Sequence, residues 1–191
     1  MDNKRKKILA AAEVLLAERG FYGLSMKALA DSAGVAAGTI YRYFENKEDL
    51  IDQLHQHVTE EIAAVTFAGL HEGLSEKEKY ILCWRNTYQS VLTNPNRLIA
   101  VSMLFLRPCV QGEEMLSCSN HHFAPLFNIY EKGIREHIFY DFPVLALLSL
   151  SFESSLNLAK KVMNQSIDKP DEQLITQIID ASWQAILKPT T

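Results

Sequence analysis

The sequence predicts an all-α protein, and three observations support that prediction. Apolar residues recur at helical spacings of three and four along most of the chain. Residues that favour helix starts, such as Ser25, Asn46 and Ser75, and a stop such as Gly34 separate these periodic segments. The sequence contains no strand-rich segment, glycine-rich phosphate loop or internal repeat. An all-helical class is therefore the one that the pattern supports.

The first expected helix covers about residues 3–19. A basic stretch followed by an apolar one superficially resembles a signal peptide, but Glu13 interrupts the apolar run and no small-residue cleavage site follows it. Ile8, Ala12 and Leu15 fall on one helical face. We therefore expect this segment to be a helix of the N-terminal domain.

Residues 25–50 predict two short helices joined by a glycine turn, followed by a third helix. Ser25 can cap the first of them, and Gly34 can close it, because glycine tolerates the left-handed backbone of a tight turn. The second helix should run from Ala37 to about Phe44. This order is typical of a helix-turn-helix DNA-binding unit.

A long helix should begin at Lys47, with Asn46 as its N-cap and Asp49 at the reciprocal capping-box position. Its apolar residues continue at spacings of three and four: Leu50, Leu54, Val58, Ile62 and Val65. This helix should therefore connect the N-terminal unit to the rest of the chain.

The second helix of a helix-turn-helix lies in the major groove of DNA. Here it carries hydroxyl, phenolic and guanidinium groups, which suit base edges and phosphates, and the lysines near the N-terminus suit the DNA backbone. The alternative to a DNA-binding role is that these side chains only pack the core of a small helical domain. The residues expected to contact DNA are Lys4, Lys6, Ser25, Thr39, Tyr41, Arg42, Tyr43 and Lys47.

The stretch GVAAGTIYRYFENKEDL is similar to the recognition-helix signature of the TetR/AcrR family of bacterial transcriptional regulators. The resemblance covers roughly residues 5–55. It implies a DNA-binding domain at 1–46 and a helical ligand-binding and dimerisation domain at 47–191. Ala36 and Ala37 depart from the family pattern, which commonly has a serine or threonine cap and then a polar residue. A lost cap costs about 1 kcal/mol of helix stability.

The two domains differ in charge within a net charge of −4. Residues 1–50 carry eight Lys and Arg against seven Asp and Glu, whereas residues 51–191 carry eleven against sixteen. The charge that could meet phosphates is thus concentrated in the N-terminal domain. The longest apolar run, PVLALLSLSF, is about half the ~20 residues that span a bilayer, so no membrane partner is expected.

The C-terminal domain should contain further helices at about residues 75–93, 95–107, 123–138, 143–165 and 170–187. Ser75 and Glu78 form a capping-box pattern at the first of these, and Asn94-Pro95 ends it. Residues 108–120 are polar and unpatterned, which predicts a loop.

Bulky residues in this domain suit a small-molecule pocket between helices, although each taken singly is more often a core residue. In the family that the chain resembles, the C-terminal domain usually contains such a cavity. The resemblance therefore implies a DNA-binding repressor that an apolar or amphipathic compound releases from DNA. Glu153 could meet a cationic ligand or point to solvent. The expected lining residues are Trp84, Tyr88, Met103, Phe105, Phe123, Phe127, Tyr130, Phe152 and Glu153.

The same resemblance implies a homodimer, in which the last two long helices pair with their copies. Those helices carry more apolar surface than a small domain needs for its own core, which favours contact with a second copy. The alternative is that the monomer buries this apolar surface itself. The expected interface residues are Leu147, Leu150, Leu158, Ile175, Ile179, Trp183 and Ile186.

The odd cysteine count, Cys83, Cys109 and Cys118, argues against a disulfide scaffold and for a reducing cytoplasm. Cys118 with His121 and His122 could support a redox- or metal-responsive regulator, or a Cys-dependent enzyme. This cluster has neither further ligands at metal-binding spacing nor an orienting third residue. We therefore expect no enzyme activity, no metal and no cofactor, and the expected partners are double-stranded operator DNA, a small-molecule effector and a second copy of the chain.

Overall fold

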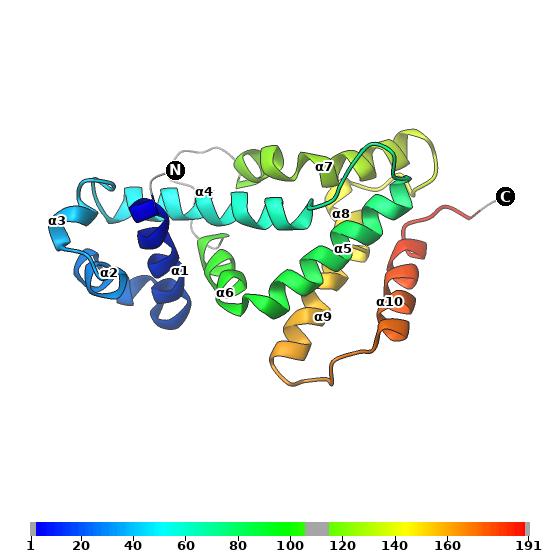
Figure 1. Ribbon diagram of the computed structural model, residues 1–191. Helices are drawn as coiled ribbons and strands as arrows, with labels where there is room; N and C mark the ends of the chain where they lie inside the picture. The colour runs from blue at the N-terminus through cyan, green and yellow to red at the C-terminus, as the bar shows by residue number, and fades with distance from the viewer. Residues whose placement is uncertain (1–2, 106–114, 190–191) are drawn as a thin grey trace. The chain divides into compact units, whose positions relative to one another are not determined.

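The computed structural model describes residues 3–105 and 115–189, and its regular elements there are all α-helices (Figure 1). One antiparallel bridge joins Phe139 to Leu187. The prediction of an all-α protein is confirmed. The chain divides into two compact units, one of Met1–Glu61 with Asn94–Met115, here called the head, and one of Ile62–Thr93 with Leu116–Thr191, here called the body.

The head contains α1 (Asn3–Gly23), α2 (Met26–Ala33), α3 (Ala37–Ile40), most of α4 (Lys47–Thr66) and α6 (Pro95–Phe105). α1 packs against both α2 and α6. Their shared core consists of fully buried apolar side chains: Ile8, Leu9, Leu16, Leu24, Leu29, Ile40, Phe44, Leu50 and Leu54. Burial of this apolar surface holds the short helices α2 and α3 in place, since helices of that length are not stable alone.

The first turn of α4 follows the predicted capping box, with one difference. The Asn46 side-chain oxygen accepts the Asp49 N–H at 2.8 Å, as expected. The Asp49 carboxylate accepts the N–H of Glu45 at 2.9 Å rather than that of Asn46.

The buried face of α4 changes along its length. Leu50, Leu54 and Val58 are buried, as predicted, but Val65 is exposed. Ala63 and Thr66 are the buried residues near the helix end. Ile62 is half-buried, so the apolar spacing stops marking the buried face only at Val65, where the buried stripe has shifted by one residue along the helix.

The body contains α5 (Glu76–Thr93), α7 (Met115–Arg135), α8 (Val144–Leu150), α9 (Glu153–Met163) and α10 (Glu172–Gln184). α5 packs along α9 and also contacts α10 (Figure 1). Large buried aromatic side chains dominate its core: Tyr80, Trp84, Tyr130, Phe139 and Trp183.

Two predicted segments of the body need correction. α7 begins at Met115, so the end of the predicted loop over 108–120 is helical, and the polar residues there hide its periodicity. The predicted helix over 143–165 is broken at Ser151, whose φ of −127° and ψ of −77° are not helical. The Ser151 hydroxyl donates to the Leu147 carbonyl at 2.6 Å. Such side-chain bonds to the backbone bend or interrupt helices.

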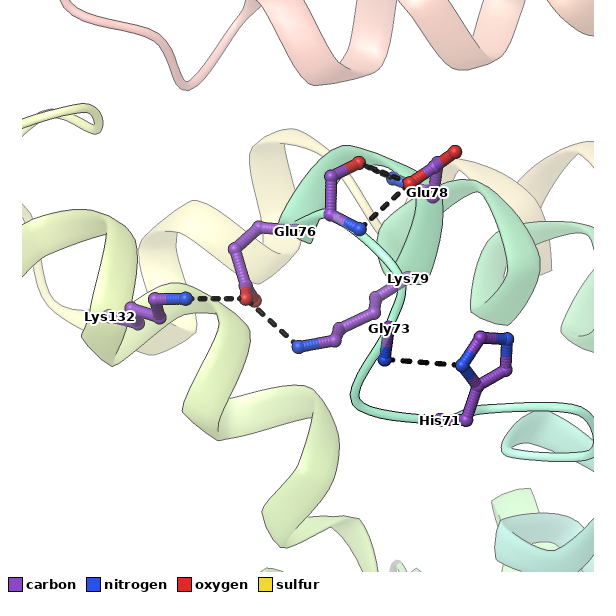
Figure 2. Close-up of polar contacts among 7 residues, drawn as sticks. His71, Gly73, Glu76, Glu78, Lys79 and Lys132 are labelled. Atoms are coloured by element: carbon purple, nitrogen blue, oxygen red, sulfur yellow. Dashed lines mark hydrogen bonds and ion pairs between the residues drawn. The ribbon is translucent and has the colours of Figure 1, made fainter.

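Polar contacts fix the start of α5 and tie it to α7 (Figure 2). The predicted capping box is present, since the Glu78 N–H donates to the Ser75 hydroxyl at 3.3 Å and the Ser75 N–H donates to Glu78 Oε2 at 2.8 Å. Glu76 Oε1 accepts from Lys79 at 3.0 Å and from Lys132 of α7 at 2.8 Å. Burial raises the pKa of the Glu76 carboxyl, but the bonds from the two lysines outweigh it and leave that pKa below its ordinary value.

Candidate nucleic-acid interface and effector site

The turn between α2 and α3 is built from the residues that predicted it. The Ser25 hydroxyl accepts the Ala28 N–H at 3.1 Å and caps α2. Gly34 has a φ of 64°, in the left-handed region, and its N–H donates to the Asp31 carbonyl at 3.3 Å. The Val35 N–H donates to the Ala30 carbonyl at 3.0 Å, which completes a Schellman motif.

α3 is one helical turn, Ala37–Ile40, and a turn at residues 41–43 continues it, so the predicted helix to Phe44 is too long. Ala36 is the N-cap of α3 and makes no side-chain cap bond, and the stability cost expected from the missing serine or threonine stays a prediction. Ile40 and Phe44 are buried, and both anchor the turn in the head core.

α3 and the turn that follows it carry several of the predicted DNA-contacting residues. Tyr41 is 58% exposed, Arg42 is exposed, and Thr39 and Tyr43 are half-buried. A Cβ placed on Gly38 would meet no atom within 4 Å, so the backbone there is open to close approach by another molecule. This arrangement can place a phenol and a guanidinium against base edges. The contacts themselves stay predictions.

The predicted backbone-contacting lysines have different environments. Lys4 and Lys6 are exposed on the first turns of α1. Lys47 is half-buried, and its ammonium group donates to the Phe21 carbonyl at 2.6 Å. This bond ties the N-terminus of α4 to the end of α1, a structural role that sequence reasoning missed, while a phosphate contact by Lys47 stays a prediction.

A buried ion pair joins α6 to α1 within the head. Arg97 Nε lies 3.2 Å from Glu13 Oε1, and the Glu13 side chain is only 6% exposed. Arg97 Nη1 also lies 3.8 Å from Glu61 Oε2 on α4. In the sequence, Glu13 stands out only as a break in an apolar run. A lone carboxylate among the buried residues of α1 is the signal that could have indicated a partner.

Most of the predicted effector-site residues lie in the body, where two of them are in direct contact. Trp84 and Tyr88 stack on α5 with ring centroids 5.5 Å apart and planes at 23°. Phe123 packs edge-on against Phe67 at 5.9 Å. Phe127 is half-buried on α7, and Tyr130 and Phe152 are buried.

Three predicted effector residues do not join this group. Met103 is half-buried in the head, and the Phe105 side chain lies outside the described residues. Glu153 is exposed in the first turn of α9, where the helix dipole favours a carboxylate, so the solvent alternative holds for it.

Serine hydroxyls satisfy the polar atoms of three buried aromatic side chains. Tyr80 Oη lies 2.8 Å from Ser182 Oγ, and Tyr130 Oη lies 2.8 Å from Ser151 Oγ. Trp84 Nε1 donates to Ser154 Oγ at 2.8 Å. Burial raises the pKa of Tyr80 to about 12, although its hydrogen bonds to serine act in the opposite direction. These phenols are therefore neutral structural groups.

The alternative of a thiol- or metal-based sensor gains no support from the described residues. Burial raises the pKa of the Cys83 thiol to about 12, so it is not a reactive thiolate. Over residues 3–105 and 115–189, no group of three or more His, Cys, Asp and Glu side chains could hold a metal ion. The side chains of Cys118 and His121 lie outside the described residues, while His122 is half-buried.

Most of the residues predicted at a dimer interface are buried within the body, and the interface itself stays a prediction. Leu147, Ile175, Ile179, Trp183 and Ile186 are buried inside the body, so they cannot provide the main contact with a second copy. Leu158 is half-buried, and Leu150 is 50% exposed. A second apolar stripe runs along the outside of α10 at spacings of three and four, formed by the exposed Leu174, Ala181 and Ala185 and the half-buried Ile178.

Among the described residues, no helix combines the length and the apolar character that crossing a membrane requires.

Comparison with known proteins gives matches over both parts of the chain. Residues 8–54 match the profile described as bacterial regulatory proteins, tetR family, and residues 76–187 match the profile described as tetracyclin repressor-like, C-terminal domain. An uncharacterized HTH-type transcriptional regulator of Haemophilus influenzae is 30% identical over 185 residues, which cover 96% of this chain and 95% of that protein.

A solved structure and a functionally named relative add to these matches. A putative transcriptional regulator of the TetR family from Vibrio parahaemolyticus has a similar structure, with a TM-score of 0.86 and 38% identity over 98% of this chain and 100% of the other. The fatty acid metabolism regulator protein of Bacillus subtilis is 34% identical over 110 residues, 56% of each chain.

Proposed function

Because the chain belongs to the TetR family of bacterial regulatory proteins, we propose that it is a homodimeric, cytoplasmic repressor that an amphipathic small molecule releases from operator DNA. The family accounts for DNA binding and transcriptional regulation, and it is not a family of enzymes. Homodimerisation, repression and release by a ligand are the parts that we propose.

The exposed side of α3 is the observation that supports operator binding most directly. Tyr41 and Arg42 are exposed in the turn that directly follows α3, between Ile40 and Phe44, which are buried in the head core. A dimer would carry two such helices, so the operator should be an approximate palindrome with half-sites about 34–36 Å apart or a multiple of that distance. The test is a gel shift and footprint with DNA that flanks the protein's own gene. A footprint without two-fold symmetry contradicts the proposal.

The outer stripe of α10 supports the dimer. A contiguous apolar face on a helix that already buries its other face is typical of a protein–protein contact. Replacing Ile178 by glutamate places a charge in this stripe without touching the buried stripe, which contains Ile179. We expect a monomer in sedimentation and a loss of operator binding. An unchanged dimer would exclude this face as the interface.

Release by a ligand requires that the ligand bind one arrangement of the protein more tightly than the other. The coupling in such systems is typically about 1–3 kcal/mol, or about 5–150-fold in DNA affinity. The body supports a role in binding an amphipathic compound because it gathers buried aromatic rings with polar edges. The name of the Bacillus subtilis relative is consistent with a compound that carries an alkyl chain.

The experiment is a thermal-shift screen of small amphipathic compounds, in which each stabilising compound is retested for release of operator DNA. Compounds that stabilise the protein but never weaken operator binding would contradict ligand release.

A further inference from the structure

α5 carries three aromatic residues with polar atoms at intervals of four, Tyr80, Trp84 and Tyr88. Residues four apart lie on the same helical face, and all three are buried in the body. The first pairs with Ser182 of α10 and the second with Ser154 of α9. The Tyr88 hydroxyl, in contrast, has no hydrogen-bond partner among the described residues.

An unpaired hydroxyl at this position is unusual. The Tyr88 residue is only 6% exposed, and the large majority of buried side-chain polar atoms have at least one partner. Such an atom has lost its hydrogen bonds to water without replacement, so a bound molecule that accepts its proton gains affinity from that bond. The Trp84 ring, which is fully buried, stacks against Tyr88, so an apolar neighbour covers that side of the phenol.

The charges near Tyr88 limit the chemistry of that molecule. Burial raises the pKa of Tyr88, and the negative charge of Glu172 on α10 raises it further. Arg85 is already engaged, because it donates to Glu172 at 2.7 Å and to the Thr176 hydroxyl at 3.0 Å. The surroundings therefore disfavour an additional anion and offer a neutral hydrogen-bond donor.

We propose that the Tyr88 hydroxyl donates a hydrogen bond to a neutral carbonyl oxygen of the effector, an ester or a ketone rather than a carboxylate. This inference rests on the proposed function, since it concerns the molecule that releases the operator.

The first test uses the protein without any ligand and compares Tyr88→Phe with Tyr80→Phe as its matched control on the same helix. Tyr80→Phe removes a hydroxyl that pairs with Ser182, so its Tm should fall by about 2–6 °C. Tyr88→Phe removes a hydroxyl without a partner, so its Tm should stay equal to that of the wild type or rise. A fall as large as that of the control would show that the hydroxyl is already paired, and would overturn the proposal.

The second test measures binding of methyl octanoate, 2-acetylnaphthalene and octanoate by calorimetry. At least one of the two neutral carbonyl probes should bind the wild type about 3–10-fold more tightly than it binds Tyr88→Phe, the range expected for one hydrogen bond. Binding to Tyr80→Phe should be unchanged, and octanoate should bind the wild type more weakly than methyl octanoate does. Equal affinity for the wild type and Tyr88→Phe, tighter binding of octanoate, or no binding of either neutral probe would each overturn the proposal.

Operator binding in the absence of probe separates this inference from the proposed function. Both the wild type and Tyr88→Phe should bind the operator equally, because the substitution lies in the body. Suppose that the wild type binds the operator and that octanoate, but not methyl octanoate, releases the operator. The proposed regulator function is then supported, and the assignment of a neutral carbonyl is overturned. If the wild type binds no operator, the proposed function itself fails.

Discussion

Replacing Arg97 by methionine should destabilise the head strongly, because it leaves Glu13 buried without its partner. Methionine keeps most of the apolar stem of arginine and removes the guanidinium, which lies 3.2 Å from Glu13 Oε1. The Glu13 side chain is 6% exposed and that of Arg97 is 19% exposed, so solvent screens this pair little. Removing one partner of a buried pair costs about 3–5 kcal/mol, and the low end applies here because Arg97 retains some exposure.

Urea unfolding, followed by circular dichroism, measures the loss in the free energy of unfolding. A loss of about 3 kcal/mol corresponds to a fall in Tm of about 6–12 °C for a chain of this size. The double variant Glu13→Leu with Arg97→Met is the control, because it removes the stranded carboxylate as well. We expect it to recover most of the lost stability, since replacing a whole buried pair by apolar residues is often neutral. If Arg97→Met unfolds like the wild type, or if the losses of the two single variants simply add, then the pair is not coupled and this reasoning is refuted.

Three further predictions concern the DNA-binding side and the start of α5. Arg42→Ala should relax sequence preference at one operator position and cost about 1–3 kcal/mol of binding free energy for the preferred operator. Competition with single-base variants of the operator measures both effects. An equal loss of affinity for all sequences would show that Arg42 contacts a phosphate instead. Gly34→Ala should lower stability by about 1–2 kcal/mol in urea, because Gly34 has a φ of 64°, whereas Gly38→Ala, at a helical position with open space, should not. Glu76→Gln should cost about 0.5–1 kcal/mol at pH 7. The folded-state pKa of Glu76 is below its ordinary value of 4.5, so the stabilisation from the Glu76 carboxylate is present above pH 4.5 and is lost as the pH falls through the folded-state pKa. The Tm difference between Glu76→Gln and the wild type should therefore shrink in acid. A Tm difference that stays constant with pH would contradict this.

The helix boundaries that the sequence predicted well are those with local causes. Ser25, Gly34, Asn46 and Ser75 each act through hydrogen bonds to residues within a few positions, and all four behave as expected. The break at Ser151 was missed although it also involves a local bond, because a serine inside an apolar run is compatible with a continuous helix. The Ser151 hydroxyl also lies 2.8 Å from Tyr130 Oη, a tertiary contact that local spacing does not predict.

Side-chain orientation was harder to predict than helix position. α10 carries apolar residues on two faces, and spacing alone assigns Ile178 and Ile179 equally well to the body core or to a partner. The choice depends on which face meets α5, where Tyr80 reaches Ser182. The pairing of Glu13 with Arg97 was likewise beyond sequence reasoning, because the two residues are 84 positions apart and nothing in their local patterns links them.

The connectivity of the two units indicates how a ligand in the body could act on the head. The chain passes between the units at residues 61–62, 93–94 and 115–116. Only the first passage lies in α4, the helix that the sequence predicted to connect the N-terminal unit to the rest of the chain. The second passage begins at Thr93. Tyr88 lies five residues before Thr93, and Arg97 lies four residues after it. A shift of α5 caused by a ligand at Tyr88 would therefore reach α6 through a short covalent connection, and the Arg97–Glu13 pair would pass it to α1. The double variant Glu13→Leu with Arg97→Met replaces the ion pair by apolar side chains. If this route carries the signal, operator binding by that variant should respond less to the ligand than operator binding by the wild type does.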